Sequence, residues 1–401
     1  MSEIHERLEE LRELGLYRRM RMVSGPQGPR VLLDGKEVLL LCSNNYLGLA
    51  DHPRVRTAAA QAAMRYGVGS GASRLVSGNM TLHRRLEERI AAFKESERCV
   101  LFGAGYLANI GVVQALARKG DVVFSDALNH ASIIDGCRMA QADTFVYRHL
   151  DTEHLEWGLR EAGGRGSLIV TDGVFSMDGD VAPLRRIVEL ARHYDARVMV
   201  DEAHATGVLG PGGRGSVAAA GLQGEVDVIV GTLGKALGSY GAYVCCDTAM
   251  ARYLVNTART LIFSTGPAPP VVAGALAALE ILWEQPHRVE RLGRNARTLR
   301  TALADQGLDP PEGETPIVPV VVGDAETAMA LCERLLRAGV FAQAIRPPTV
   351  PDGTSRLRLA AMATHKEPEL RRAAGALAVA FDKVGAAVDP GPRARIFDYA
   401  A

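Results

Sequence analysis

A lysine at position 235 follows an apolar stretch of the type found in buried strands, and it stands between two glycines, Gly234 and Gly238. The apolar stretch covers residues 226–230. Burial lowers the pKa of a lysine, and the neutral amine that results can attack a carbonyl carbon. The alternative is a solvent-facing lysine on a glycine-rich loop. Lys235 alone therefore leaves the chemistry open.

Three other polar segments also follow predicted strands. They are Asp201-Glu202-Ala203-His204, Thr171-Asp172-Gly173-Val174-Phe175-Ser176 and Asn129-His130-Ala131-Ser132. Ligands of α/β sheets bind at the carboxyl ends of the strands. The carboxylate of Asp201 can pair with a protonated pyridine nitrogen, which keeps the ring an electron sink. Together with Lys235, these segments predict a site for pyridoxal phosphate (PLP).

Each of these side chains also has a structural interpretation. Asp201 could cap the turn that follows it, His130 could be the residue at which a helix begins, and His204 could be a satisfied structural histidine. In a PLP site, His130 can stack on the cofactor ring. His204 and Ser176 can donate hydrogen bonds to its phenolic oxygen.

A phosphate group has its own predicted place in the sequence. Gly105 and Tyr106 stand where a strand meets the start of a helix, and free amides together with the helix dipole favour an anion there. Thr232 and the pair Ser264-Thr265 offer hydroxyl groups for the same phosphate.

Two segments are similar to nucleotide-binding motifs, but each lacks features that those motifs require. Residues Asp201 to His204 match the DEAH box of helicases, which requires a separate phosphate-binding loop. The candidate loop around Lys235 lacks two residues of that motif, since Ile229 replaces its first glycine and Ala236 replaces its serine or threonine. The segment 210–215 fits GxGxxG, but Pro211 lies inside it and no strand leads into it. We interpret it as a turn.

Composition narrows the class of protein. The 401 residues are 47% apolar and carry a formal net charge of zero, which fits a globular protein and gives no global field for nucleic acid or an anionic membrane. The six cysteines show no metal-ligand spacing, and no signal peptide is evident, so we expect reduced thiols in a cytoplasmic protein. No apolar run has the length of a membrane span.

The pattern of elements predicts an α/β protein with a large, mostly parallel sheet domain and a smaller C-terminal αβ domain. We expect an N-terminal helix and extended arm over 1–50, a large domain over 51–285 and a small domain over 286–401, with an irregular, mobile tail from Asp389. The strands expected in the large domain are 99–102, 122–125, 144–147, 168–171, 198–200, 226–230 and 242–245. Helices are expected at 3–15, 81–94, 106–117, 131–140, 270–306, 325–338 and 367–384, and further strands at 38–42, 317–322, 341–345 and 356–360.

These segments, in this order, resemble the α-oxoamine synthase family of fold-type I PLP enzymes, from about residue 39 to about 365. The resemblance rests on Cys42-Ser43-Asn44-Asn45-Tyr46-Leu47-Gly48, Gly69-Ser70-Gly71, Asp126-Ala127-Leu128-Asn129-His130-Ala131-Ser132, Gly173-Val174-Phe175-Ser176-Met177-Asp178-Gly179-Asp180, Asp201 to Gly207, the Lys235 loop and Phe263-Ser264-Thr265. Asn45 stands where many relatives carry aspartate, and Asp172 where several carry glutamate. Both departures leave the acyl and amino acid preference open, and they do not affect the cofactor roles.

The resemblance implies a role for each site residue. Lys235 carries the cofactor covalently and moves the Cα proton, Asp201 pairs with the ring nitrogen, and His130 stacks on the ring. The other implied cofactor contacts are Ser176 and His204 at the phenolic oxygen, and Gly105, Tyr106, Thr232 and, from a partner subunit, Thr265 at the phosphate. Arg358 is implied to bind the amino acid carboxylate, and Arg18, Asn44, His130 and Thr349 fall on other substrate-binding positions.

Within the family, the stretch from Ala344 to Pro351 and the segment Arg356-Leu357-Arg358 resemble the oxononanoate synthases of biotin biosynthesis. That resemblance implies a homodimer with shared active sites that condenses L-alanine with pimeloyl-CoA or pimeloyl-acyl carrier protein. The products would be 8-amino-7-oxononanoate, carbon dioxide and the free thiol. The alternatives are a glycine C-acetyltransferase (2-amino-3-ketobutyrate CoA ligase), a serine palmitoyltransferase-like enzyme, or an inactive scaffold subunit, a class that lacks the lysine this chain retains.

Overall fold

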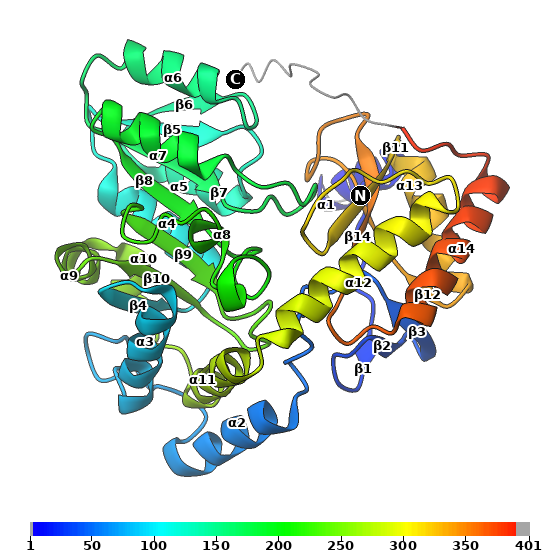
Figure 1. The fold of residues 1–401 in the computed structure, drawn as a ribbon, viewed down its shortest axis with the longest axis horizontal. Coiled ribbons are helices and arrows are strands. Elements are labelled where there is room, and N and C mark those ends of the chain that lie inside the picture. The colour runs from blue at the N-terminus through cyan, green and yellow to red at the C-terminus, as the bar shows by residue number, and fades with distance from the viewer. Residues whose placement is uncertain (1–2, 390–401) are drawn as a thin grey trace. The chain divides into compact units, whose positions relative to one another are not determined.

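The computed structural model describes residues 3–389, and within this range the chain divides into two compact units (Figure 1). The first unit contains residues 3–48, 177–179 and 291–389, and the second contains 49–176 and 180–290. The N-terminal arm thus groups with the C-terminal part of the chain. The three-part division at 50 and 285 stays a prediction, and the tail expected from Asp389 onward lies, apart from that residue, outside the described range.

The second unit is built on a seven-stranded sheet with the order β4-β10-β9-β8-β7-β5-β6, counted within residues 3–389. Neighbouring strands from β5 to β9 are parallel, whereas β10 is antiparallel to both β9 and β4. The fold is α/β, with a mostly parallel sheet as predicted. The strands are β4 (Arg98–Phe102), β5 (Val122–Asp126), β6 (Asp143–Tyr147), β7 (Ser167–Asp172), β8 (Arg197–Asp201), β9 (Val228–Thr232) and β10 (Ala242–Cys246).

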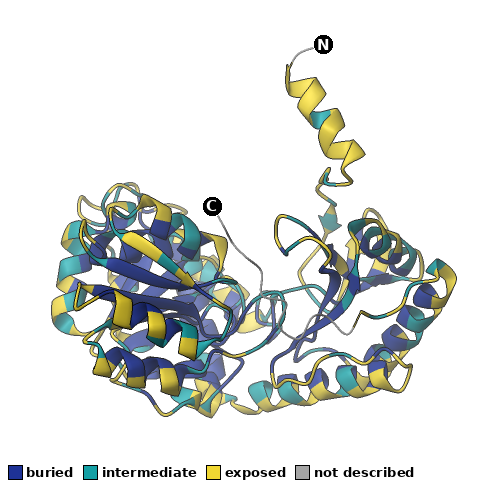
Figure 2. Cartoon of the chain, turned by 90° about the horizontal axis from the view of Figure 1, so that it is seen from above, coloured by how far each residue is buried: buried dark blue, intermediate teal, exposed yellow. Residues whose placement is uncertain are grey.

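These strands form a buried sheet because apolar side chains occupy both of its faces. In β8, Val198, Met199 and Val200 are at most 1% exposed. Figure 2 shows buried strands surrounded by helices whose outer residues are exposed. The helices of this unit are α2 (Pro53–Tyr66), α3 (Thr81–Lys94), α4 (Gly105–Leu116), α5 (Ala131–Met139), α6 (Thr152–Glu161), α7 (Leu184–His193), α8 (Ser216–Ala219), α9 (Thr248–Thr257), α10 (Arg259–Ile262), α11 (Pro269–Glu284) and the 3-10 turn η1 (Pro211–Gly213).

The long helix expected over 270–306 is wrong as a single element. It is two helices, α11 and α12 (His287–Ala304), which are separated at Gln285 and Pro286. Proline lacks an amide hydrogen and disfavours helical backbone in the residue before it, so α11 ends at Glu284.

The first unit contains two small sheets, counted within the described residues. One has the order β11-β14-β13 and the other β1-β2-β3-β12. The single strand expected over 341–345 is therefore wrong, because its two halves pair with different partners: β12 with β3, and β13 with β14. The elements are α1 (Glu3–Glu13), β1 (Val23–Ser24), β2 (Arg30–Leu33), β3 (Lys36–Leu40), β11 (Ile317–Gly323), α13 (Ala325–Arg337), β12 (Val340–Phe341), β13 (Gln343–Ile345), β14 (Ser355–Ala360) and α14 (Glu367–Val384).

Burial differs sharply along this unit. Its core is formed by β11, β14, α13 and α14 together with part of α12. Helix α1, by contrast, buries none of its residues, and Figure 2 shows it exposed beside the N-terminus. Across residues 3–389, no helix combines the length and the apolar character needed to cross a bilayer.

A buried ion pair lies directly behind the end of β8. Lys94, at the end of α3, pairs with Glu202, and the two side chains are 2% and 0% exposed. Lys94 also donates to Thr206 Oγ1 at 2.7 Å. The other oxygen of Glu202 accepts from Ser216 Oγ at 2.9 Å and from the Val217 amide at 2.7 Å. Both charges thus have several partners, which buried ions require.

We expect Lys94→Met to destabilise the protein by about 3–5 kcal/mol, because it leaves the Glu202 carboxylate buried without its cation. The denaturant midpoint at fixed protein concentration measures this loss. Arg84→Met is the matched control, since Arg84 and Glu88 form an exposed pair whose loss costs little. Lys94→Met combined with Glu202→Gln should recover part of the loss. Equal midpoints for the two single variants would contradict the expectation.

Candidate active site

Several polar residues lie at the carboxyl edge of the large sheet. Asp172 ends β7 and is paired in register with Asp201, which ends β8, and Asp201 is paired in turn with Val230 of β9. The strand order also reverses between β5 and β7, since β5 continues outward to β6 and β7 continues to β8. Such a reversal opens a crevice at the carboxyl ends, where α/β proteins bind ligands. The residues after β5, β7, β8 and β9 therefore meet at one edge.

Asp201 is buried and accepts two hydrogen bonds. Its Oδ2 accepts from Asn109 Nδ2 at 2.6 Å, and its Oδ1 accepts from the Ala203 amide at 2.8 Å. The capping interpretation therefore holds for one oxygen, while the other is held by a buried amide from α4. Asn109 was not found from the sequence. Its only signal there is a polar residue within a predominantly apolar helix.

His130 is the N-cap of α5, as the helix-start interpretation proposed. Its Nδ1 lies 2.7 Å from Ser132 Oγ, which also accepts from Asn109 Nδ2 at 2.8 Å. A continuous chain of hydrogen bonds therefore joins His130, Ser132, Asn109 and Asp201. His130 is nevertheless an exposed residue. Desolvation by the surrounding protein lowers its pKa, Asp201 opposes that shift and Lys235 adds to it.

Asp172 is a second buried carboxylate beside Asp201. Its Oδ2 accepts from the His130 amide at 3.1 Å, and its own amide donates to Asn129 Oδ1 at 2.9 Å. Burial and the charge of Asp201 raise the Asp172 pKa well above the usual aspartate range, while Lys235 acts in the opposite direction. Lys235 is thus close enough to both His130 and Asp172 to act on the pKa of each.

Lys235 lies in a tight loop between β9 and β10, which are antiparallel neighbours. The loop is closed by hydrogen bonds from the Leu233 amide to Gly241 O at 2.9 Å and from the Ser239 amide to Leu233 O at 2.8 Å. Lys235 is half-buried, which corrects the expectation of a buried lysine: β9 ends at Thr232, so the lysine lies beyond the strand and partly open to solvent.

The start of α4 suits a phosphate group. The N-cap residue Ala104 makes no side-chain hydrogen bond to the first turn, and a Cβ on Gly105 would meet no atom within 4 Å. The first amides of α4 are thus accessible to an anion. Tyr106 can contribute only through its amide, because its hydroxyl is bonded to Asp135. The Thr232 hydroxyl already donates to Gly241 O at 3.2 Å and accepts from the Gly234 amide at 3.1 Å.

The remaining predicted residues of this unit have different surroundings. His204 is buried in the turn after β8, and Ser176 is half-buried after β7. Thr265 is exposed and forms an isolated antiparallel bridge with Ser73. A buried carboxylate with an amide donor, an adjacent lysine and histidine, and open helix amides form a donor set that fits PLP.

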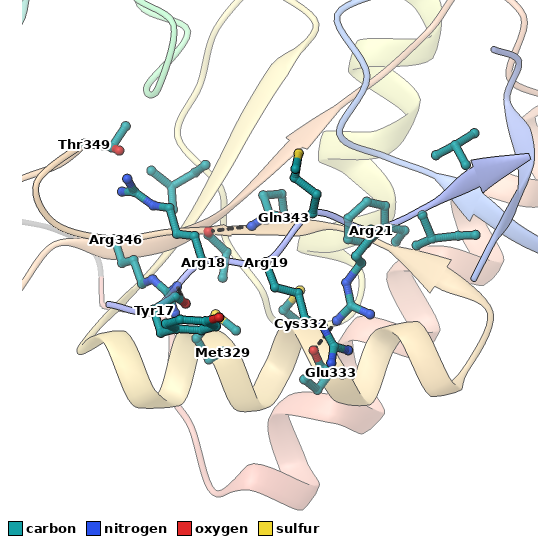
Figure 3. A pocket seen from close by; sticks show the side chains of 16 residues that line it. Tyr17, Arg18, Arg19, Arg21, Met329, Cys332, Glu333, Gln343, Arg346 and Thr349 are labelled. Atoms are coloured by element: carbon teal, nitrogen blue, oxygen red, sulfur yellow. Dashed lines mark hydrogen bonds and ion pairs between the residues drawn. The ribbon is translucent and has the colours of Figure 1, made fainter. Parts of the chain in front are cut away.

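The predicted substrate residues Arg18, Asn44, Thr349 and Arg358 belong to the first unit, where they form two groups. Arg18 and Thr349 line a pocket of about 750 Å³ together with Arg346. Arg18, Arg346 and Thr349 lie at one end of it, and Arg21 with its partner Glu333 lies at the other (Figure 3).

The second group links Asn44 to Arg358 through a buried tyrosine. Arg358 Nη2 donates to the Tyr46 hydroxyl at 3.1 Å, and that hydroxyl donates to Asn44 Oδ1 at 3.2 Å. The Arg358 side chain does not face water. It is 5% exposed, because β14 is the central strand of its sheet.

Comparison with known proteins agrees with this architecture. Residues 36–377 match the family described as aminotransferase class I and II. An 8-amino-7-oxononanoate synthase of Citrifermentans bemidjiense is 53% identical over 96% of this chain and 100% of its own length. A serine palmitoyltransferase of S. paucimobilis, solved with bound PLP, has a TM-score of 0.91 at 33% identity and covers 95% of this chain and 97% of its own.

A structure of 8-amino-7-oxononanoate synthase from Francisella tularensis has a TM-score of 0.75 at 26% identity, over 86% of this chain and 98% of its own. The match of the family model to most of the chain and the identity of these relatives decide the assignment. The chain belongs to the class I and II aminotransferase family and, within it, to the α-oxoamine synthases.

Proposed function

We propose that this chain condenses L-alanine with a pimeloyl thioester to give 8-amino-7-oxononanoate, carbon dioxide and the free thiol. The observation that carries the proposal is the Lys235 hairpin beside Asp201, in a chain 53% identical to a relative that bears this activity in its name. A serine palmitoyltransferase-like or glycine-using activity is the alternative, since the serine palmitoyltransferase structure is similar at 33% identity. The higher identity favours the first reaction. The cytoplasmic location inferred from the sequence stays a prediction.

PLP would be held by the residues of the second unit. Lys235 would bind it covalently, Asp201 would pair with the ring nitrogen, and His130 would stack on the cofactor ring. His204 and Ser176 serve the phenolic oxygen, and the amides of Gly105 and Tyr106 serve the phosphate. The Thr232 hydroxyl would also bind the phosphate if its hydrogen bond to Gly241 O were broken. When bound, the cofactor supplies an electron sink for the negative charge that develops at the amino acid Cα.

The protein's own groups then orient substrate and move the proton. Lys235, as the neutral amine, would be the base for the Cα proton, since it lies close enough to His130 and Asp172 to act on the pKa of both. The Asn109 amide keeps Asp201 in place by its 2.6 Å hydrogen bond. In the first unit, the guanidinium fork of Arg358 suits the amino acid carboxylate.

The pocket that Arg18 and Thr349 line suits an acyl chain with an anionic end. Apolar side chains of Met329, Phe341 and Ile345 contribute to its wall. Burial lowers the pKa of Arg346, and so does the charge of Arg18. An anion between these two guanidinium groups would relieve their repulsion, as the distal carboxylate of a pimeloyl group or a phosphate of its carrier could do.

A second copy of the chain would cover an apolar surface of the second unit. Val68, Leu75, Val76 and Phe263 are between 54% and 81% exposed. The loop that carries Leu75 and Val76 is joined to the Phe263 segment, since Ser73 bridges Thr265 and the Gly266 amide donates to Ala72 O at 3.0 Å. Exposed apolar groups on two linked loops favour a protein interface. Thr265 lies within it, consistent with a contribution to the partner's phosphate site.

We expect a homodimer in solution, and we expect Leu75→Lys combined with Val76→Lys to shift it toward monomer, because two charges would be buried in the interface. Sedimentation velocity over a dilution series measures the change, and activity should fall in parallel. Val379→Lys is the control, since Val379 is a comparably exposed valine on α14. A fully active monomer of the unchanged chain would contradict the shared site.

We expect the purified protein to be yellow with bound PLP and to be labelled at Lys235 after borohydride reduction, because a lysine that binds the cofactor covalently becomes a stable secondary amine. Peptide mapping locates the label. Assays with L-alanine, glycine or serine and with pimeloyl, acetyl or palmitoyl thioesters then identify the substrates. A colourless protein that takes up no PLP would exclude the enzyme, and turnover confined to another pair of substrates would identify a different family activity.

We expect Arg358→Ala to weaken L-alanine binding by about 2–4 kcal/mol, or some 30- to 1000-fold, because a charged bidentate contact is lost. PLP uptake should survive, since Lys235 and Asp201 belong to the other unit. Titration of alanine against the cofactor absorption measures the dissociation constant. Arg346→Ala is the matched variant and should raise the KM for the thioester instead. An unchanged alanine affinity in Arg358→Ala would make Arg346 the next candidate for the carboxylate.

A further inference from the structure

Two segments that follow strands of the large sheet carry residues assigned above to the cofactor. One is the turn after β5, which runs from Asp126 to His130. The other is the segment after β7 that contains Ser176; its ends pair through a bridge between Val174 and Val181 and a 3.0 Å bond from the Phe175 amide to Asp180 O. The distance between these two segments sets how far the His130 ring lies from the Ser176 hydroxyl.

A histidine outside both segments binds one carboxylate from each. His149, two residues after the end of β6, places Nδ1 at 2.8 Å from Asp126 Oδ1 and Nε2 at 2.7 Å from Asp180 Oδ2. The edge of its ring meets Phe175 at a centroid distance of 4.4 Å and an interplanar angle of 87°. An ionised carboxylate can only accept, so both ring nitrogens must carry hydrogen. With both carboxylates ionised, this geometry requires the charged imidazolium.

The surroundings of His149 support this charge state. Burial acts to lower its pKa, but the hydrogen bonds and charges of Asp126 and Asp180 outweigh it and raise the pKa to about 10. The two aspartates also depend on the cation. The Asp126 side chain is 1% exposed, and Oδ1 of Asp180 is buried without a hydrogen-bond partner among residues 3–389. Removing the imidazolium would leave the Asp126 carboxylate with little solvent to compensate, whereas the Asp180 side chain is 34% exposed and keeps partial access to water.

We propose that His149 is a positioning residue that fixes the spacing between the His130 turn and the Ser176 segment by binding Asp126 and Asp180 at once. This rests on the proposed function, because it assigns the spacing a purpose in holding PLP. Asp126 fits such a connection, since it also accepts from the amides of Leu128 at 2.8 Å and Leu150 at 2.9 Å. It thereby joins the His130 turn to the His149 segment through backbone as well as side chain.

The charge on His149 also determines the pH range in which it binds both Asp126 and Asp180. Its pKa is higher in the folded than in the unfolded chain, so its contribution to stability is complete below the ordinary histidine range. The contribution declines as the pH rises and is lost as the pH passes through the folded pKa near 10. The groups that face the ring are Asp126 from β5, Asp180 from the segment after β7, and the uncharged Phe175. The imidazolium therefore persists at neutral pH.

The first test uses selectively ¹⁵N-histidine-labelled full-length protein with and without PLP. The His149 signals, identified by their absence in His149→Gln, should show both nitrogens protonated up to about pH 9. Titration of His149 in the ordinary range of a free imidazole would overturn the proposal. Because this measurement does not need the cofactor, it decides about His149 even if the chain takes up no PLP, which by itself would refute only the proposed function.

The second test measures PLP binding and the absorption maximum of the bound cofactor. His149→Gln should raise the PLP dissociation constant about tenfold and shift the maximum, because one buried hydrogen-bonding partner is lost and Ser176 moves relative to His130. His193→Gln, which changes an exposed histidine on α7, should leave both unchanged. If His149→Gln fails to fold, Asp180→Asn should show the same changes more weakly. Wild-type values in a folded His149→Gln would overturn the proposal.

Discussion

The ammonium group of Lys94 and the carboxylate of Glu202 meet in the interior of the second unit, and the turn that carries the site depends on that contact. Glu202 follows Asp201 directly and precedes His204 by two residues, so fixing its side chain fixes the backbone that positions both. Two buried charges are costly to desolvate, and here four further polar groups, Thr206 Oγ1, Arg214 O, Ser216 Oγ and the Val217 amide, form hydrogen bonds with them. The turn after β8 is therefore held by bonds that point away from the site.

On the other side of that turn, the site combines two carboxylates with one lysine. Asp201 receives two donors, whereas Asp172 receives one and lies against the charge of Asp201, which favours the protonated form of Asp172. The pair can thus present a single negative charge to a cationic ring. Asn109 and Ser132 connect that charge to His130 without adding any of their own.

Much of this arrangement could be read from local pattern. The strands of the large sheet are short apolar runs, and Asp201 and Lys235 follow two of them, so their place at the sheet edge was predictable. Asn109 was not, because its role depends on α4 reaching Asp201 at the end of β8, a contact between residues 92 positions apart. The break at Pro286 was visible in the sequence but was masked by the apolar periodicity on either side. The arm at the N-terminus groups with the C-terminal part through the pairing of β3 with β12, which has no local signal.

The hairpin between β9 and β10 has a consequence for the evolution and engineering of this chain. The residues from Leu233 to Gly241 are closed at both ends by the same two strands, and a Cβ on Gly238 would lie 2.3 Å from the backbone nitrogen of Ala50. Gly238 also has a φ of +59°, a backbone conformation that disfavours other residues. The loop therefore holds Lys235 at a fixed distance from the sheet. An insertion or deletion within it would change the distance of Lys235 from the sheet, so the length of this loop limits the changes that the chain can accept here.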